Sequence, residues 1–556
     1  MPNTRPFEAV RNDPFEGLKE LRNISELQRP TFTPRPAISR EAFRVRTRTS
    51  TMYWCIVGLW ALLCVPMLMA AAPIISGAFN RSDLLGATVS STTLFIMYFW
   101  LNGMKDVVYP IAYRATSWKK QVVPRRPQGR SPLVGLLYVT CNDISEESLR
   151  LSIRQNYPNF EVYALDDSSK AEFQARVDRF AWMYKIPVIR RTNRPKGFKA
   201  GNLNNFLQSP AGQRLDHFVI VDSDEVLPPN FIDRCLDYFQ DPSVGIVQAN
   251  HIATRNRTSF MKMFAPGVNS HWPVYQKVKA HAGFLSLLGH GAMVSRDAYL
   301  TARGFPEIVA EDIGFAIDAL RGGYRTEFAE DVLCGEEFPV DYFAFEKRHK
   351  KWTEGNMEFI RTYAGRILFS KQLRWYEKLD IVLFTFSLPL TGVFSLYVIV
   401  NAIIFPEVHF SNKFPLWMLI PTVTFLIAPM LNDILTWRHV PKRKLVSYLL
   451  HSMALFGSVY FASLFASLKT TFGGSVFHVT PKTAGKVSFA SALRQNKVKL
   501  IASVVLAALV DAASGSVFAV VLIITPAFFG IYLSVMNAGD KPSDDSDGGH
   551  IFQETD

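Results

Sequence analysis

Two aspartates separated by one residue, Asp222 and Asp224, are the feature of the sequence with the clearest chemistry. They follow the apolar run 218–221, which has the length and composition of a short buried strand. Carboxylates at this spacing can bind one divalent cation, Mg²⁺ or Mn²⁺, and leave other coordination positions free for phosphate oxygens. Alone, an Asp-x-Asp sequence is more often a turn or a pair of solvated acids. Its place after a buried strand, with other motifs nearby, favours a nucleotide-sugar site.

Similar polar side chains follow two other predicted strands. Thr140 and Asp143 come after the run 133–139, and Asp166 follows the run 161–165. Ligands of open α/β sheets bind beyond the carboxyl ends of the strands. These groups are therefore candidates for holding the base and ribose of a nucleotide, although each alone fits a turn at a strand end equally well.

Two predicted helix starts add a cation and a base. Lys199, in the stretch KAGNLN, can hold a donor phosphate or support the metal; the alternative is a solvated lysine beside a helix cap. Glu311 and Asp312 begin the helix predicted in AEDIGFAIDALRGGYR. A carboxylate there can act as the general base that removes the proton of an acceptor hydroxyl. The alternative is that both acids only complement the dipole at the helix N-terminus.

The run RHKKW at 348–352 combines cations with an aromatic ring. Arg348 and Lys351 can offset the charge of a departing diphosphate, and the indole of Trp352 offers an apolar face to a sugar ring. By itself such a run is usually a basic surface patch. Together with the preceding motifs, it completes the groups that glycosyl transfer from a nucleoside diphosphate sugar requires.

The elements that must position these groups alternate between strand and helix from residue 133 to residue 356. This alternation predicts a mainly parallel, open α/β sheet. The predicted strands are 133–139, 161–165, 188–190, 218–221 and 244–248, with helices between most of them, for example 146–155 and 170–183.

Composition places this block between membrane segments. Of the 556 residues 48% are hydrophobic, and the long apolar runs cluster towards both ends of the chain. The net charge of +13 is concentrated beside these runs, as expected of loops that face the cytoplasm and anionic lipid, and no nucleic-acid-binding signature is present. The five cysteines form no CxxC motif, which predicts neither a disulfide framework nor a zinc site and fits a reducing compartment.

We predict six membrane-spanning segments with both termini inside. The amphipathic stretch 357–378 is expected at the membrane interface, and residues 446–468, which have basic flanks on both sides, are expected to lie in the interface or re-enter it. The predicted order is a cytoplasmic N-terminal segment (1–50), two transmembrane helices (51–104), a cytoplasmic catalytic domain (105–356), the interfacial helix (357–378), two transmembrane helices (379–437), an interfacial or re-entrant helix with a loop (438–498), two transmembrane helices (499–537) and a disordered cytoplasmic tail (538–556).

The combination of motifs resembles membrane-embedded family 2 glycosyltransferases, and most closely the bacterial cellulose synthase catalytic subunit and related β-glucan synthases such as curdlan synthase. The resemblance covers roughly residues 133–482. It rests on the stretches QNYPNFEVYALDDSS, KAGNLN, VDSDEVLPPNF, GHGAMVSRDAYLTARGF, AEDIGFAIDALRGGYR, RHKKW and FHVTPK. It implies a Rossmann-like α/β catalytic domain of the GT-A type inserted between α-helical transmembrane segments.

The resemblance also implies roles for individual residues. Asp166 would contact the uridine, Asp222 would bind the diphosphate and the metal, Asp224 would be a metal ligand, and Asp312 would be the catalytic base. The donor site would further include Thr140, Asp143, Lys199, Arg348 and Lys351. The acceptor site would include Trp352, Gly289, His290 and Glu311, and a gating loop over the donor would include Phe477, Val479, Thr480 and Lys482.

Three departures from the family pattern bear on specificity. Lys351 stands where an arginine is usual and lacks its bidentate fork. Ala310 replaces a threonine before the Glu-Asp pair, and Gly289-His290-Gly291 replaces a Cys-Gly-Ser/Thr element in the acceptor floor. The fit of the acceptor, and with it the linkage, is therefore not predicted by the resemblance.

The sequence thus predicts an enzyme, a hexosyltransferase that is a processive, inverting β-glycosyltransferase of the cytoplasmic membrane. It would polymerise a UDP-sugar, UDP-glucose before UDP-N-acetylglucosamine, into a β-glucan and move the polymer across the membrane. The expected partners are the UDP-sugar, a divalent cation, the growing polysaccharide and the lipid bilayer, with an accessory export subunit left open and no nucleic acid. The alternatives are a non-processive transferase that adds one sugar to a lipid carrier, and a catalytically dead transporter or scaffold.

Overall fold

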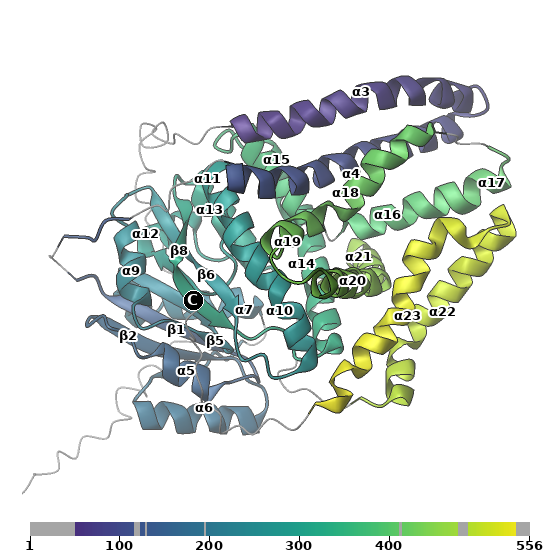
Figure 1. Cartoon of the computed structure of the whole chain (residues 1–556). Helices are drawn as coiled ribbons and strands as arrows, with labels where there is room; N and C mark the ends of the chain where they lie inside the picture. Colours follow the sequence, from purple (N-terminus) through teal and green to yellow (C-terminus); the bar gives the residue numbers. More distant parts are fainter. Residues whose placement is uncertain are drawn as a thin grey trace, which may run out of the picture.

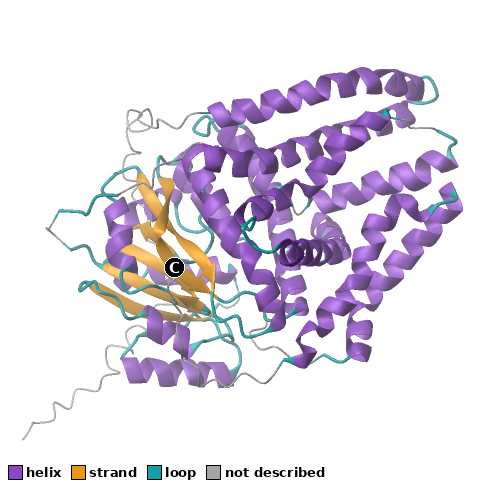
Figure 2. Cartoon of the chain, in the orientation of Figure 1, coloured by secondary structure: helices purple, strands orange, loops and turns teal. Residues whose placement is uncertain are grey.

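The computed structural model describes residues 50–115, 123–127, 131–193, 196–387, 389–410, 414–475 and 487–540. A sheet covered by helices forms one side of the molecule, and long apolar helices fill the other side (Figures 1 and 2). Helices from before and after the sheet domain lie together on this second side. The arrangement confirms the predicted fold class, a Rossmann-like α/β domain inserted between helical segments.

The sheet has eight strands in the described residues, in the order β3-β2-β1-β4-β7-β6-β8-β5. Strands β1 to β4 run parallel to one another, and β6 runs parallel to β8. Strand β7 is antiparallel to both β4 and β6, and β5 is antiparallel to β8. The bounds are β1 Val134–Thr140, β2 Phe160–Asp166, β3 Val188–Ile189, β4 His217–Asp222, β5 Glu225–Val226, β6 Val244–Ala253, β7 Ala292–Ser295 and β8 Arg325–Glu336.

The five predicted strands are confirmed as β1, β2, β3, β4 and β6. Strands β5, β7 and β8 were not predicted. Two of these are only two and four residues long, and β8 carries charged side chains at several positions, so none shows the apolar run or the clean alternation that marks a strand. Antiparallel β7 lies between β4 and β6 and makes the sheet mixed.

Alternate residues of the central strands enter two different cores, one on each face of the sheet. In β4, Phe218 and Ile220 belong to one core and Val219 and Val221 to the other, as the two-residue period of a strand requires. The first core is covered by α7 (Phe198–Leu207), α12 (Arg296–Ala302) and α13 (Glu311–Arg321), and the second by α5 (Glu146–Ser152), α6 (Ala171–Tyr184) and α9 (Phe231–Tyr238). Both helices predicted by range, α5 and α6, are present.

Four helical stretches in the described residues are long and apolar enough to cross a membrane: Thr51–Phe79, Asp83–Ala115, Leu416–Thr436 and Lys442–Phe472. The last of these contains residues 446–468, which we predicted to lie in the interface or to re-enter. Its two parts, α20 (Lys442–Ser458) and α21 (Tyr460–Phe472), meet at Val459. These helices indicate a membrane protein, while the number of spans and the division into domains stay predictions.

The helices not yet given by label include those that make up the first three of these stretches. They are α3 (Thr51–Phe79), α4 (Asp83–Ala115), α8 (Pro210–Gln213), α10 (Ser259–His271) continued by the π-helix η2 (Trp272–Gln276), α11 (Lys277–Ala282), α14 (Tyr342–Leu368), α15 (Trp375–Thr385), α16 (Leu390–Ile399) with η3 (Val400–Ile404) and α17 (Phe405–Glu407), η4 (Leu416–Met418), α18 (Leu419–Ile427), η5 (Ala428–Met430), α19 (Leu431–Thr436), α22 (Phe489–Ser514), η6 (Val517–Val520), α23 (Val521–Val535) and η7 (Met536–Gly539).

The predicted interfacial helix 357–378 differs from the structure in its bounds and its packing. One helix, α14, ends at Leu368, and a second, α15, begins at Trp375. The apolar face that we assigned to lipid is buried, because Phe359, Tyr363 and Ile367 pack into the core beneath α13. An amphipathic helix shows the same periodicity whether it lies on lipid or on protein, so the pattern could not separate the two.

Candidate active site

A cavity of about 1580 Å³ extends from the carboxyl ends of the strands into the group of apolar helices. It brings together every described candidate residue except Asp166. These residues are Thr140, Asp143, Lys199, Asp222, Asp224, Gly289, His290, Glu311, Asp312, Arg348, Lys351 and Trp352. The predicted gating residues Phe477, Val479, Thr480 and Lys482 lie outside the described residues.

The first strand end is tied to the Asp-x-Asp motif by Asp143. One carboxylate oxygen of Asp143 accepts hydrogen bonds from the Thr140 hydroxyl (2.9 Å) and the Cys141 amide (2.7 Å). The other oxygen accepts one from the Ser223 hydroxyl (2.8 Å). Ser223 lies between the two aspartates, so Asp143 fixes the turn after β4 rather than projecting freely into the cavity.

Asp166 is a correction to the prediction, since its side chain does not line the cavity. Its carboxylate is fully buried and accepts hydrogen bonds from Arg190 Nε (2.7 Å) and the Ser168 amide (2.8 Å). The next residue, Asp167, lines the cavity instead and pairs with Arg191 at 2.6 Å. Successive side chains of an extended chain point to opposite sides, and the register that decides between two adjacent acids is not visible in the sequence.

One carboxylate of the Asp-x-Asp motif, that of Asp222, already forms an ion pair with a cationic side chain. The Lys199 ammonium pairs with Asp222 and also donates to the Gly289 carbonyl (2.8 Å). Burial raises the pKa of Asp222, but the charges of Lys199 and His290 outweigh it and lower the pKa to about 2. Asp222 is therefore ionised at neutral pH. Two carboxylates on one cavity wall, one already facing a cation, fit Mg²⁺ or Mn²⁺, both of which prefer oxygen ligands.

Glu311 and Asp312 begin α13 and line the same cavity. Burial and the neighbouring charge of Asp312 raise the pKa of Glu311 to about 7, and burial also raises the pKa of Asp312. One oxygen of Asp312 accepts a hydrogen bond from the Ile313 amide (2.8 Å). The backbone at Gly289, where φ is +90°, lies near Asp312: a Cβ at this position would be 3.4 Å from the Asp312 carboxylate. Two adjacent buried acids with raised pKa values suit proton transfer near neutral pH.

Three residues of the RHKKW run on α14, Arg348, Lys351 and Trp352, line the cavity. Arg348 lies over the Trp352 indole, 4.5 Å from the ring centroid, and donates to Glu336 (3.1 Å). Burial lowers the pKa of Lys351, while the negative charges of Glu311 and Asp222 act in the opposite direction. Trp352 keeps 44% of its surface exposed. The helix thus adds two cations and a partly exposed aromatic ring to the cavity that the Asp-x-Asp motif also lines.

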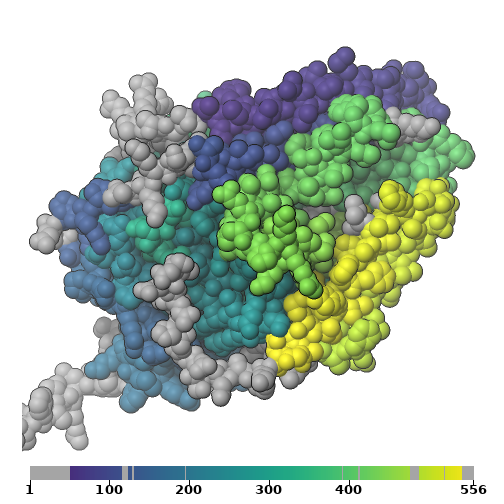
Figure 3. Space-filling view, viewed as in Figure 1, coloured from purple at the N-terminus to yellow at the C-terminus, as the bar shows by residue number. Residues whose placement is uncertain are grey.

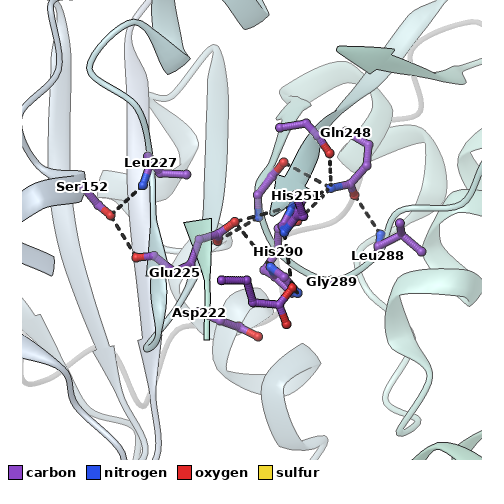
Figure 4. A network of polar contacts seen from close by, with 12 residues as sticks. Ser152, Asp222, Glu225, Leu227, Gln248, His251, Leu288, Gly289 and His290 are labelled. Carbon is purple, nitrogen blue, oxygen red and sulfur yellow. Dashed lines mark hydrogen bonds and ion pairs between the residues drawn. The ribbon is translucent and has the colours of Figure 1, made fainter. Parts of the chain in front are cut away.

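A buried network that the sequence did not indicate surrounds His290 (Figure 4). His290 lies between Glu225 (3.4 Å) and Glu336 (3.7 Å), and His251 also contacts both acids. Burial lowers the pKa of His290, but Glu336 and Glu225 outweigh this effect and raise it to about 10. Different strands, far apart in sequence, contribute Glu225, His251 and Glu336. No local sequence motif therefore indicates that these residues lie together.

Part of the chain is similar to known glycosyltransferases. Residues 217–431 match the family model "Glycosyl transferase family group 2". A probable glucomannan 4-β-mannosyltransferase 7 of Oryza sativa subsp. japonica is 27% identical over 229 residues, which are 39% of this chain and 38% of that protein. Glucomannan 4-β-mannosyltransferase 7 of Arabidopsis thaliana is 23% identical over 303 residues, 51% of this chain and 54% of that protein. The alignments thus span about half or less of these relatives.

Solved structures similar to the chain include a mannosyltransferase of Pyrobaculum calidifontis in complex with GDP-Man and Mn²⁺. Its TM-score is 0.42 and its identity 19%, over 69% of this chain and 99% of that one. S. aureus TarS 1–349 has a TM-score of 0.32 and 17% identity, over 61% of this chain and 90% of that one.

Residues 217–431 therefore match a family 2 glycosyltransferase domain, and the predicted enzyme class, a glycosyltransferase, is confirmed at this level. The matched span contains Asp222, Asp224, Asp312 and Trp352. The relatives are glucomannan mannosyltransferases. A specific relation to the bacterial cellulose synthase subunit therefore stays an expectation.

Proposed function

We propose that this protein is an inverting, processive β-glycosyltransferase that extends a polysaccharide and passes it into its own membrane helices. The observation that carries the proposal is the continuity of the cavity. The same cavity is lined by Asp222 and Asp312 at the strand ends and by polar side chains of the apolar helices, among them His451 of α20 and Tyr532 of α23. These two side chains bond to each other at 3.1 Å, and such groups suit a hydrophilic chain.

The chemistry is a single in-line displacement at the anomeric carbon. Asp312 accepts the proton of the acceptor hydroxyl, and its raised pKa makes it a better proton acceptor. Asp222 and Asp224 hold the divalent cation, which when bound supplies positive charge to the departing diphosphate. Lys199, Arg348 and Lys351 add further cations.

The acceptor is held by Trp352 and by the segment at Gly289. The exposed face of Trp352 stacks on the terminal sugar ring, and the Gly289 segment forms the floor beside Asp312. Glycine at this position is favoured by its positive φ, since a Cβ would meet the Asp312 carboxylate only at an ordinary contact distance. An acceptor bound in this way would have its hydroxyl next to the base.

The donor is a nucleoside diphosphate hexose. Resemblance to β-glucan synthases favours UDP-glucose, whereas the names of the two relatives favour a mannosyl donor. Asp167 and Thr140 at the strand ends are the groups placed to meet the base and ribose. We place the sheet domain in the cytoplasm, where nucleotide sugars are made, and the helices in the cytoplasmic membrane.

The test is nucleotide release by the purified protein in detergent or vesicles. UDP-glucose, GDP-mannose and UDP-N-acetylglucosamine are each supplied with Mg²⁺ or Mn²⁺, and the products are sized. We expect one donor to yield a long polymer, Asp312→Asn to lose at least about 100-fold in rate, and the exposed control Asp178→Asn to keep its activity. A product limited to one sugar on a lipid would support the non-processive alternative and contradict the proposal. Failure with every donor would contradict catalysis by this chain alone.

A further inference from the structure

Side chains from three separate elements converge on one buried point beside the catalytic cavity. His251 comes from β6 and His290 from the segment before β7, and the two lie close together in Figure 4. Glu336 ends β8. Glu336 Oε2 lies 3.4 Å from His251 Nδ1 and 3.7 Å from His290 Nε2. The three possible ligand atoms are all within 4.8 Å of one another. His251 is fully buried and Glu336 nearly so.

The separation of 3.4 Å between Glu336 and His251 is that of two atoms that share a metal ion, and the 3.7 Å between Glu336 and His290 is slightly longer. Tetrahedral ligands at Zn–N and Zn–O distances of about 2.0–2.2 Å lie about 3.3–3.6 Å apart. Direct hydrogen bonds would be shorter, at about 2.7–3.2 Å. His251 Nδ1 is buried and makes no hydrogen bond of ordinary length to the described residues; its ion-pair partner is the Glu336 carboxylate, 3.4 Å away. A metal ion bound between these two atoms would replace that long contact by direct ligand bonds.

Neighbouring side chains already fix the orientation of both histidine rings. Glu225 lies on the opposite nitrogens of both rings, 3.7 Å from His251 Nε2 and 3.4 Å from His290 Nδ1. Trp272 stacks on the His251 ring at 4.4 Å. Carboxylates in that position fix the orientation of metal-ligating histidines and raise their basicity.

The backbone is also built closely around this group. The Gly291 amide donates to Glu225 (2.9 Å), and a Cβ at Gly291 would lie 2.3 Å from both Glu225 and His251. Arg348 binds only the other oxygen of Glu336, Oε1, so Oε2 stays available. The loop that carries His290 is thereby held against β5 and β6 in one arrangement.

We propose that His251, His290 and Glu336 bind a transition-metal ion of the Zn²⁺ class, separate from the Mg²⁺ or Mn²⁺ of Asp222 and Asp224. Two imidazoles and one carboxylate are a known zinc ligand set that leaves a fourth position open. His290 and Glu336 also line the cavity, so the fourth position is on the cavity side. The ion ties the acceptor floor at 288–291 to β6 and β8. Cysteine spacing predicted no zinc site, because these ligands are histidine and glutamate from distant segments.

A second set on the other side of His251, made of Glu225, His251 and Cys334, competes with this assignment. All three of its residues are fully buried, and neither Glu225 nor Cys334 lines the cavity. Glu225 already accepts the hydrogen bond from the Gly291 amide. The set with Glu336 is therefore the one with both a buried nitrogen that makes no ordinary hydrogen bond and a route for an ion to enter.

The experiment measures metal content in the full-length protein after removal of its affinity tag. The protein in detergent is incubated with Zn²⁺ or Co²⁺, dialysed against excess Mg²⁺, and analysed by elemental mass spectrometry. We expect about one Zn²⁺ per chain, lost in His290→Gln and Glu336→Gln and bound about 10–100-fold more weakly in Glu225→Gln. Cys334→Ser and Asp224→Asn are the controls, and both should keep the ion.

X-ray absorption at the zinc edge of the wild-type protein decides the ligand set without any variant. Nitrogen and oxygen neighbours alone, with histidine scattering, support the site at Glu336. A sulfur neighbour, or loss of zinc in Cys334→Ser, assigns the ion to the competing set and overturns the proposal. Wild-type protein that retains no zinc also overturns it, and leaves the cluster as a network of charged side chains.

Discussion

At the scale of single residues, Asp166 shows how burial decides between two adjacent acids. Asp166→Asn should destabilise the fold by about 1–3 kcal/mol, because it weakens a charged hydrogen bond to Arg190 inside the protein. The KM for the nucleotide sugar should change little, since the side chain does not line the cavity. Thermal unfolding and donor kinetics measure the two effects. An unchanged melting temperature with a strongly raised KM would restore the predicted contact with the base.

The pair Glu311 and Asp312 should set the acid side of the pH profile. A base must be ionised to accept a proton, and burial and mutual repulsion raise the pKa of Glu311 to about 7. We therefore expect kcat/KM to rise with pH through an apparent pKa of about 7 that belongs to the pair. Glu311→Gln removes one of the two repelling charges, so the limb should move to lower pH. A limb that does not move in this variant would contradict the coupling.

The same pKa has a consequence for stability with a definite sign. A carboxyl whose pKa is higher in the folded than in the unfolded chain favours folding at low pH and loses that contribution as pH rises. For Glu311 the window runs from about 4.5, the ordinary value, to about 7. The wild-type melting temperature should thus fall across this window relative to Glu311→Gln. Equal pH dependence of both proteins would show that Glu311 ionises normally.

Residue types at strand ends were predictable, and their exact partners were not. Asp222, Asp224 and Asp312 were identified because acids after a buried strand or at a helix start form a local pattern. His251, Glu225 and Glu336 form no such pattern, since pairing of β5, β6 and β8 brings them together. The choice of Asp167 over Asp166 depends on the last residue of β2, a boundary that propensity does not locate.

At the scale of elements, α14 joins the two halves of the site. Its basic and aromatic residues face the cavity, while Phe359 and Tyr363 two turns further on pack in the sheet-domain core. Sequence periodicity located the apolar face of this helix but not what covers it, because protein and lipid select the same pattern. The start of α14 at Tyr342 is set by Asp341, whose carboxylate accepts a hydrogen bond from the Ala344 amide (2.8 Å).

The exposed indole on α14 leads to a prediction about product length. Trp352→Ala should remove the stacking surface for the acceptor and shorten the polymer, with at least about a tenfold loss of long products. Trp352→Phe keeps an aromatic face and should keep most of them. Stability should change little, because the ring is 44% exposed. Product sizing beside nucleotide release measures this effect. Polymer of wild-type length from both variants would remove Trp352 from the acceptor site.

At the scale of the whole molecule, the sheet domain and the helices enclose one cavity between them. In Figure 3 the segment containing α19 and α20 (light green) lies between the sheet domain (teal) and the C-terminal helices (yellow), and α20 packs on α23. Both helices contribute lining residues. If the product passes through the helices as proposed, the chemistry at the strand ends and that passage share cavity walls, and a change far from the aspartates would alter the product.

Ala454→Trp tests that coupling, because Ala454 lines the helical part of the cavity and an indole there fills much of the path. We expect transfer to a short soluble oligosaccharide to persist, while long polymer falls at least about tenfold, since only a growing chain must pass the indole. The matched control is Ala508→Trp on α22, an exposed position outside the cavity lining, which adds the same bulk without obstructing it. Polymer sizing in vesicles, beside nucleotide release with the short acceptor, separates the two effects. If Ala454→Trp makes polymer as long as the control does, the product leaves by another route and the helical part of the cavity is not its path.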